Sequence, residues 1–249
     1  MNAGDRPRIL VTGASRRVGR AVALELAGRG LDLVLTHRTS PADCEETARR
    51  CRELGGVAAE VHELHLESES ALHDFAGHVS GSGIDGIVHN ASRYVRTPFD
   101  RLDPEEILLH FRVNAMAPLL LTSLLSQGLR SSRLPRGGAV VCMGDIHSLG
   151  RPRGEYSAYL ASKGALDRVV DCLALELGPT VRVNGVAPGV VAWAADDLTE
   201  DEQRRYVERI PMGREGTLEE AAETVAWLML DAGYVNGSMI RLDGGRHLR

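Results

Sequence analysis

The strongest constraint on the fold is the alternation of short apolar, β-rich runs with helical stretches along the whole chain. Seven such runs are present, from RILVT at residues 8–12 to SMIRL at residues 238–242. Strands separated by helices favour parallel pairing, because each return to the sheet needs a long crossover. No linker, repeat or low-complexity segment interrupts the pattern. We therefore predict an α/β fold in which residues 1–249 form a single domain around one doubly wound, seven-stranded parallel sheet.

The other strands are expected at residues 31–36, 57–62, 84–89, 139–143 and 181–186, and the helices at residues 18–28, 41–54, 68–78, 104–129, 159–177 and 218–230. Asn114 interrupts an apolar segment of the long helix, and an amide there usually has a specific partner because it competes with the helix hydrogen bonds. Pro118 is expected to bend this helix or to mark an irregular turn. The polar residues 190–216 follow the carboxyl end of a strand, and we interpret them as a substrate-covering segment.

Composition argues against several classes of protein. The formal net charge of −5 and the lack of a basic block do not favour nucleic-acid binding. Four cysteines without zinc spacing are typical of reduced thiols in the cytosol. The N-terminus lacks the apolar core of a signal peptide, and no run approaches the roughly 20 apolar residues that span a bilayer. We expect a cytoplasmic protein without a membrane partner, and without a metal, since His62 and His65 lack zinc-helix spacing.

A glycine-containing turn, from Gly13 to Gly19, joins the first strand to the first helix. Glycines allow the backbone to approach a phosphate closely, and the N-terminus of the helix offers free N–H groups. The spacing differs from the G-x-G-x-x-G fingerprint, so the turn alone is equally compatible with an ordinary strand-to-helix connection.

The residues after the second strand favour NADPH over NADH. An acidic side chain at this point would accept a hydrogen bond from the ribose 2′-hydroxyl. Instead of that acid, the sequence has His37, Arg38, Thr39 and Ser40. Arg38, together with Arg16 or Arg17, could hold a 2′-phosphate by charge-assisted hydrogen bonds. The alternative is a solvated loop.

Tyr159 and Lys163 are four residues apart in a helical stretch, so their side chains share one face. An ammonium group beside a phenol favours the phenolate and lowers its pKa from about 10. Tyr159 is therefore a candidate proton donor or acceptor. Because Tyr-x-x-x-Lys is short and common, the spacing alone is also compatible with two solvated surface residues.

Taken together and in order, the motifs of this chain resemble those of the short-chain dehydrogenase/reductases. The resemblance runs from Arg8 to the C-terminus. It includes Thr12-Gly13-x-x-x-x-x-Gly19, Asn90-Ala91-Ser92, Asn114, Tyr159-x-x-x-Lys163, Pro188-Gly189 and Asp243-Gly244-Gly245. Each motif is modest alone, whereas the ordered set is highly specific.

The resemblance implies a Rossmann-like fold with NAD(P)H on the glycine turn. Tyr159 would be the catalytic acid, Lys163 would bind the nicotinamide ribose and lower the pKa of Tyr159, and Asn114 would hold a water in a proton relay. The residues expected to contact the cofactor are Gly13, Ser15, Arg16, Arg17, Val18, Gly19, His37, Arg38, Thr39, Ser40, Leu66, Asn90, Ala91, Ser92, Tyr159, Lys163, Pro188, Gly189 and Val190.

Two positions depart from the family pattern. Most members have a serine thirteen residues before the tyrosine, and this offset falls on Ile146, with Asp145 one residue earlier. An aspartate replaces that serine in the pteridine-reductase branch, which Gly-Asp-Ile-His resembles. We infer that one inserted residue in the loop at residues 148–155 shifts Asp145 by one position. The second departure is His65, where the family usually has an aspartate near the adenine.

Further residues resemble the same branch. Arg17 would face the cofactor phosphate and the substrate, the ring of Tyr94 would stack on a pterin, and Ser92 would lie at the mouth of the site. With Asp145, Tyr159 and Trp193 these form the expected substrate side. The plain alternatives are a surface charge for Arg17, ordinary packing for Tyr94 and no site role for Asp145.

The resemblance implies NADPH-dependent reduction of a pterin, with Asp145 and Tyr159 orienting the substrate and delivering the proton. The nearest alternative is a carbonyl reductase of the same family, such as a 3-oxoacyl thioester reductase, and a more distant one is a non-catalytic NADPH-binding regulator. The family also implies a homotetramer, in agreement with the apolar faces of the two long helices, although a dimer remains compatible.

Overall fold

The computed structural model describes residues 6–81, 83–193 and 198–249. Its seven strands form one sheet in the order β3-β2-β1-β4-β5-β6-β7, and every neighbouring pair is parallel. The predicted α/β fold is therefore confirmed. The strands are β1 (Arg8–Val11), β2 (Asp32–His37), β3 (Ala59–Glu63), β4 (Gly86–His89), β5 (Gly138–Met143), β6 (Val181–Pro188) and β7 (Met239–Leu242).

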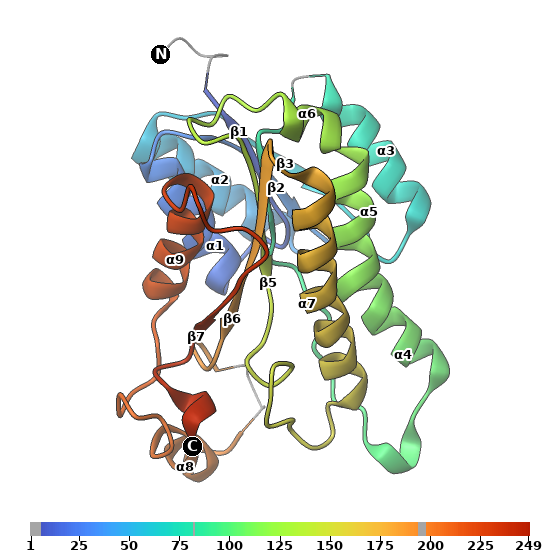
Figure 1. The fold of residues 1–249 in the computed structure, drawn as a ribbon, viewed down its shortest axis with the longest axis vertical. Coiled ribbons are helices and arrows are strands. Elements are labelled where there is room, and N and C mark those ends of the chain that lie inside the picture. Colours follow the sequence, from blue (N-terminus) through green and yellow to red (C-terminus); the bar gives the residue numbers. More distant parts are fainter. Residues whose placement is uncertain (1–5, 82, 194–197) are drawn as a thin grey trace.

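Helices cover both faces of the sheet (Figure 1). On one face lie α1 (Arg17–Gly28), α2 (Pro41–Gly55) and α9 (Leu218–Leu230); on the other lie α3 (Glu69–Ser80), α4 (Pro104–Phe111), α5 (Ala117–Leu124), α6 (Ser126–Arg130) and α7 (Ser157–Leu177). Short 3-10 turns occupy Phe99–Arg101 and Arg246–Leu248, and α8 (Glu200–Val207) lies outside these layers.

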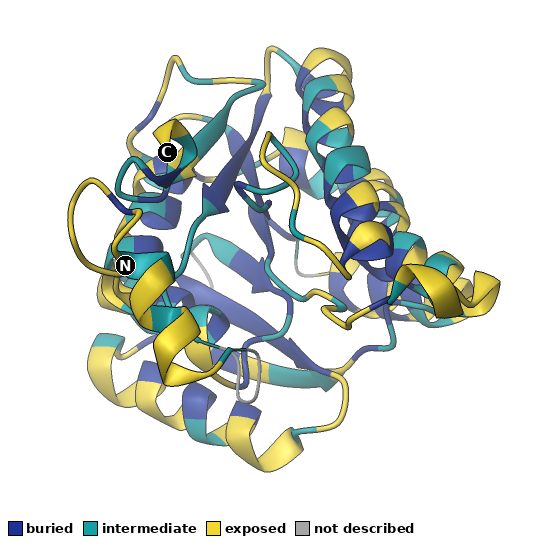
Figure 2. Cartoon of the chain, turned by 90° about the horizontal axis from the view of Figure 1, so that it is seen from below, coloured by how far each residue is buried: buried dark blue, intermediate teal, exposed yellow. Residues whose placement is uncertain are grey.

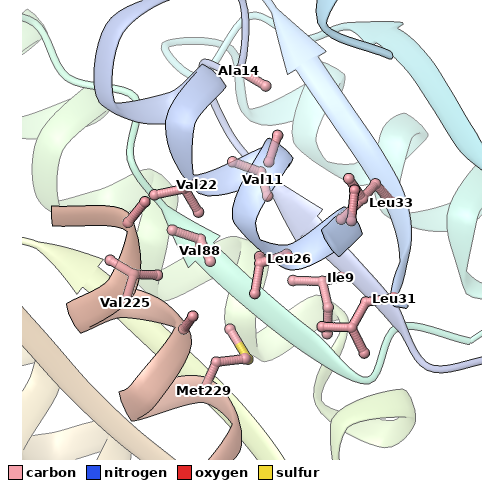
Figure 3. Close-up of a cluster of buried hydrophobic side chains, with 14 of the residues drawn as sticks. Ile9, Val11, Ala14, Val22, Leu26, Leu31, Leu33, Val88, Val225 and Met229 are labelled. Carbon is pink, nitrogen blue, oxygen red and sulfur yellow. The ribbon is translucent and has the colours of Figure 1, made fainter. Parts of the chain in front are cut away.

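Each face of the sheet carries its own apolar core. Figure 3 shows one of them, where Val22 and Leu26 of α1 pack against Val225 and Met229 of α9 above the strands. The core is aliphatic, as the aromatic content of 4% requires. Burial of these side chains stabilises the sheet and fixes the positions at which its strands end.

The long helix expected at residues 104–129 is not one regular helix. A π-helical turn at Arg112–Met116 separates α4 from α5, and α6 follows as a distinct short helix. Pro118 lacks the N–H that would bond to the Asn114 carbonyl four residues earlier, which favours such an irregularity. The expected irregularity is present, but it precedes Pro118 and contains Asn114.

The same helical region bears on the expectation that no run of the chain spans a bilayer. Among the described residues, Pro104–Leu124 is long and apolar enough to cross a membrane by length and composition alone, and 44% of its most apolar window is buried. It packs on α7, and its Ala117 and Leu121 are buried in the core. These contacts are those of a core helix in an α/β protein.

The carboxyl ends of the strands meet at one edge of the sheet, seen from below in Figure 2. The strand order reverses between β1 and β4. From β1 the chain first adds β2 and β3 on one side of the sheet, and it then crosses back to add β4 on the other side of β1. Open α/β sheets bind ligands in the crevice at such a reversal. The residues that follow β1, β4 and β5 are therefore the ones to consider as a site.

Candidate active site

The turn after β1 forms a backbone cradle at the start of α1. Gly13 has a φ of +67°, and a Cβ on Gly19 would lie 2.2 Å from the Gly13 carbonyl oxygen. Asn90 after β4 donates from Nδ2 to the carbonyl oxygens of Thr12 and Gly13, both at 3.0 Å. Glycine at these two positions lets the backbone fold closely enough to leave the first N–H groups of α1 accessible to a phosphate. These residues fit the pyrophosphate of a dinucleotide.

Basic and hydroxyl groups gather at the ends of β1 and β2. Arg16 donates to the Ser40 hydroxyl at 2.7 Å, and Ser15 donates to the Ser40 carbonyl oxygen at 3.2 Å. His37 and Arg38 line a cavity of about 240 Å³ beside this point, and Thr39 is exposed next to them. Such a set fits a 2′-phosphate, since guanidinium groups bind phosphate oxygens in pairs.

The same cavity contains a carboxylate that sequence reasoning missed. Leu66 and Glu67 line it, whereas His65 hydrogen-bonds Glu63 at 2.8 Å and lies 3.3 Å from Glu67. Glu67 Oε2 is buried without a hydrogen-bond partner among the described residues. Glu67 thus offers an acceptor at the position where a family aspartate would act, and its place two residues after His65 is the signal that could have identified it.

Tyr159 and Lys163 lie at the reaction end of a second cavity, of about 480 Å³. The Tyr159 hydroxyl donates to Asp145 Oδ2 at 2.9 Å, and the Lys163 ammonium donates to the Met143 carbonyl oxygen at 2.6 Å. Asp145 Oδ1 accepts from the backbone N–H of His147 at 2.8 Å, which fixes the carboxylate in place. A volume of this size is within the usual range of small-molecule sites.

The expectation that Lys163 lowers the pKa of Tyr159 is wrong for this structure. Burial of the phenol raises the pKa of Tyr159 well above 10, and the neighbouring Asp145 carboxylate raises it further. Burial also lowers the pKa of Lys163 to about 8. The Lys163 nitrogen lies 5.8 Å from the centre of the Tyr159 ring and is engaged by Met143. Tyr159 is therefore held as a protonated phenol, the form that donates a proton.

The position of Asp145 answers the question raised by its offset. Its carboxylate lies beside Tyr159, whereas Ile146 is buried, with its Cδ1 3.5 Å from where a Cβ on Gly189 would lie. Arg151 and Glu155 both have left-handed φ angles, of 53° and 63°. These unusual conformations lie in the loop where we expected the additional residue, between Asp145 and Tyr159 along the chain.

The Asn114 side chain joins the end of β4 to α7. Its Oδ1 accepts from Ser92 Oγ at 3.1 Å and from the Arg93 N–H at 2.7 Å, and its Nδ2 donates to the Arg93 carbonyl and to Ser162 Oγ at 3.0 and 2.9 Å. These four contacts use the hydrogen-bonding capacity of the amide. Within the described residues the amide therefore binds protein groups, and a role of Asn114 in a proton relay stays a prediction.

Aromatic rings border the substrate side of the cavity. Tyr94 stacks on Tyr156 with ring centres 4.8 Å apart and meets Tyr159 edge-on at 4.7 Å. Arg153 lies over the Tyr156 ring and donates to the Tyr94 hydroxyl at 2.9 Å. Tyr94 is 37% exposed, so part of its ring remains available to a ligand.

The expected substrate-covering segment, residues 190–216, lies across the same cavity, although its residues 194–197 are outside the described chain. Arg17, whose φ is +53°, donates to the Ala192 carbonyl oxygen at 2.7 Å. Trp193 meets Tyr206 of α8 edge-on at 5.5 Å. Tyr206 in turn lies 3.2 Å from His147 Nε2, so α8 is linked to the loop that carries Asp145.

The structure brings most of the sequence-predicted residues together around the two cavities. Ser15, Thr39, Ser40 and Asn114 do not line the described parts of either cavity and instead border or support them. The predicted residues that line the larger cavity are Gly13, Arg16, Arg17, Val18, Gly19, Asn90, Ala91, Ser92, Tyr94, Asp145, Tyr159, Lys163, Pro188, Gly189, Val190 and Trp193. His147, Arg153 and Tyr206 also line it and were not predicted from the sequence. Among the residues that the structure describes, no three His, Cys, Asp or Glu side chains gather as metal ligands.

Comparisons with known proteins place this arrangement in a family. A family model described as enoyl-(acyl carrier protein) reductase matches residues 13–247. The chain is 32% identical over 247 residues to 3beta-hydroxysteroid dehydrogenase 1 of Eggerthella lenta, covering 96% of this chain and 93% of that protein. It is 33% identical over 244 residues to the 3-oxoacyl-[acyl-carrier-protein] reductase FabG of Aquifex aeolicus, covering 95% of each.

Solved structures agree. The acetoin dehydrogenase from Enterobacter cloacae superposes with a TM-score of 0.86 at 30% identity, covering 99% of this chain and 97% of that one. These similarities extend over the glycine turn, the Tyr159–Lys163 pair and the segment beyond β6, so they concern the whole arrangement described above.

Proposed function

The chain belongs to the short-chain dehydrogenase/reductase family, and on that premise we propose that it reduces a pterin with NADPH. The substrate would be of the dihydropteridine, dihydrobiopterin or dihydromonapterin type. The observation that supports this most strongly is the hydrogen bond from the Tyr159 hydroxyl to Asp145 Oδ2 at 2.9 Å. We propose that this carboxylate takes the place of the serine hydroxyl that most members of the family present to a carbonyl substrate.

The chemistry of the two side chains favours a nitrogen heterocycle. An ionised carboxylate only accepts hydrogen bonds, and a pterin presents amino and ring N–H donors along its pyrimidine edge. A ketone oxygen presents acceptors alone and would face the Asp145 carboxylate without a hydrogen between them. Asp145 therefore suits a pterin edge better than a carbonyl.

NADPH, when bound, supplies a hydride to the ring carbon of the substrate C=N bond. Arg16, Arg38 and Ser40 would hold its 2′-phosphate, and the Gly13–Gly19 turn its pyrophosphate. We propose that Lys163 holds the nicotinamide ribose, close to the end of β5.

Proton transfer falls to Tyr159. Its raised pKa keeps the phenol protonated until the substrate nitrogen, which gains basicity as the neighbouring carbon is reduced, takes the proton. The O–H bond of Tyr159 breaks and an N–H bond forms on the pterin, which leaves a phenolate. A proton from solvent then restores the phenol.

A carbonyl reductase is the second candidate, and the names of the relatives favour it. They include a hydroxysteroid dehydrogenase, L-xylulose reductases and a 3-oxoacyl thioester reductase. The geometry at Asp145 and Ile146 argues against a carbonyl reductase. Asp145 presents a carboxylate and Ile146 is a buried apolar side chain, so a substrate carbonyl oxygen would have Tyr159 as its hydrogen-bond donor at this end of the cavity.

We further propose a cytoplasmic site of action and a small-molecule substrate as the main partner. The four cysteines are free thiols, three buried and one, Cys172, exposed, which agrees with a reducing compartment.

A substrate screen that follows NADPH oxidation tests the proposal. Dihydrobiopterin, dihydromonapterin and a 3-oxoacyl thioester would be compared under identical conditions. We expect turnover of at least one dihydropterin at a kcat/KM well above that of the thioester. No turnover of either pterin, together with efficient reduction of the thioester, would replace pterin reduction by the second candidate.

A further inference from the structure

A second carboxyl group, that of Asp167, lies beneath the catalytic groups. It follows Tyr159 and Lys163 on α7 at the same four-residue interval, so the three side chains share one face of the helix. Its Oδ1 lies 3.4 Å from where a Cβ on Gly144 would be, directly under the turn that carries Asp145. The Asp167 carboxylate therefore lies next to the backbone at Gly144.

Ser148 links Asp167 to the Asp145 turn. Its hydroxyl oxygen lies 2.9 Å from Asp167 Oδ2 and 2.7 Å from the carbonyl oxygen of Asp145. Asp167 Oδ1 is buried and has no hydrogen-bond partner among the described residues. A partly buried carboxylate with one unpaired oxygen interacts more strongly with a nearby charge than an exposed carboxylate does.

The nearby charge is the ammonium group of Lys163. Burial lowers the pKa of Lys163, whereas the carboxylates of Asp145 and Asp167 oppose that change. Burial likewise raises the pKa of Asp167 to about 6, and Lys163 opposes it. The other titratable groups facing the pair are Asp171 on α7, Cys142 on β5 and Tyr159. Between about pH 6 and pH 8, both Asp167 and Lys163 carry their charges.

We propose that Asp167 is a positioning residue of the reaction, which keeps Lys163 charged and, through Ser148, holds the Asp145 turn against α7. It acts through these two groups, without contact to the substrate. The Asp145 carboxylate accepts a hydrogen bond from Tyr159 and would also bind the substrate. Asp167 makes neither contact, so its negative charge stays near Lys163 during the whole reaction. The inference rests on the roles proposed above for Tyr159 and Lys163.

The test compares the pH dependence of kcat/KM in Asp167→Asn and Asp171→Asn with that of the wild type. Asp171 lies one helical turn further along α7, is paired with Arg168 and provides the matched control. In the wild type, kcat/KM should fall as pH rises above about 8, where Lys163 loses its proton. Removing the Asp167 charge should move this fall to lower pH, because a negative charge that opposes the loss of the Lys163 proton is gone. kcat should decrease more than KM increases.

The proposal would be overturned if kcat/KM of Asp167→Asn fell at the same alkaline pH as kcat/KM of the wild type and of Asp171→Asn. If the asparagine variant does not fold, Asp167→Ser removes the same charge with a smaller side chain and must show the same shift. Rescue by Asp167→Glu would support it. The shift can be followed with any substrate that the wild type reduces, or through the pH dependence of NADPH affinity, so failure of pterin reduction would be recognised separately.

Discussion

At Tyr159, burial and one carboxylate outweigh the neighbouring lysine. The sequence spacing correctly predicted that Tyr159 and Lys163 share a helix face, but the direction of the pKa change depends on contacts that spacing does not contain. Asp145 comes from another part of the chain, the turn after β5, and its contact with Tyr159 is a tertiary one. For the same reason, His147 and Asp167 could not be identified from motifs, because each gains its environment from tertiary contacts.

Tyr159→Phe tests the proton donor. We expect kcat to fall by roughly 10²- to 10⁴-fold, the usual loss when a general acid is removed. NADPH affinity, measured by fluorescence titration, should change little, because the phenol is bound to Asp145. Tyr156→Phe, which alters a buried neighbour in the same aromatic cluster, is the control. A Tyr159→Phe enzyme with more than a tenth of wild-type kcat would contradict the assignment.

Lys163 makes a prediction about stability that does not depend on activity. The pKa of Lys163 is about 8 in the folded protein and near 10.5 in the unfolded chain. Between these two pH values the unfolded chain therefore binds more protons than the folded protein does. As a result, the free energy of unfolding of the wild type increases with pH in this range. Below about pH 8 the buried charge costs at most about 3 kcal/mol. The stability of Lys163→Met relative to wild type should therefore decline from pH 7.5 to pH 9.5 in thermal unfolding. A constant difference would show that the pKa of Lys163 is not lowered.

Among the elements, the strands were predicted within about two residues of their observed bounds, because apolar runs between helices leave little freedom. The long helix was the element predicted least well. Its apolar pattern continues through the π-helical turn at Arg112–Met116, where Pro118 removes one helix hydrogen bond and Asn114 contacts Arg93 and Ser162. The spacing of apolar residues predicts which helix face is buried, but it does not predict a change from α-helix to π-helix.

The loop after β2 carries the prediction on cofactor choice. Arg38→Ala should raise the KM for NADPH by about 10- to 100-fold and leave the KM for NADH nearly unchanged, since a charged hydrogen bond to the 2′-phosphate would be lost. Arg50→Ala, an exposed arginine on α2, is the matched control. Equal effects of Arg38→Ala on the two cofactors would contradict selection for NADPH at this loop.

At the scale of the molecule, a parallel sheet with helices on both faces could be predicted from alternation alone. The helices on one face leave apolar side chains exposed: Leu108 is 46%, Met116 41% and Leu119 42% exposed on α4, the π turn and α5. Such a surface on a two-sided α/β protein is suited to a second copy of the chain.

We therefore expect the wild type to sediment as a homotetramer, or as a dimer, at micromolar concentration. Leu119→Glu should shift the distribution to smaller species, because it buries a charge in the expected interface. Leu54→Glu replaces a leucine on α2 that is 63% exposed, at the opposite face of the sheet, and should leave the distribution unchanged. A monomeric wild type would remove the basis for the assembly.

The central claim is that the Asp145 carboxylate beside Tyr159 selects a pterin over a carbonyl. The most direct measurement is the ratio of kcat/KM for dihydrobiopterin to kcat/KM for a 3-oxoacyl thioester, in the wild type and in Asp145→Ser. We predict a ratio well above one in the wild type and a decrease of about 10- to 100-fold in the variant, the equivalent of one hydrogen bond to a charged group. A wild-type ratio below one that Asp145→Ser leaves unchanged would contradict the account.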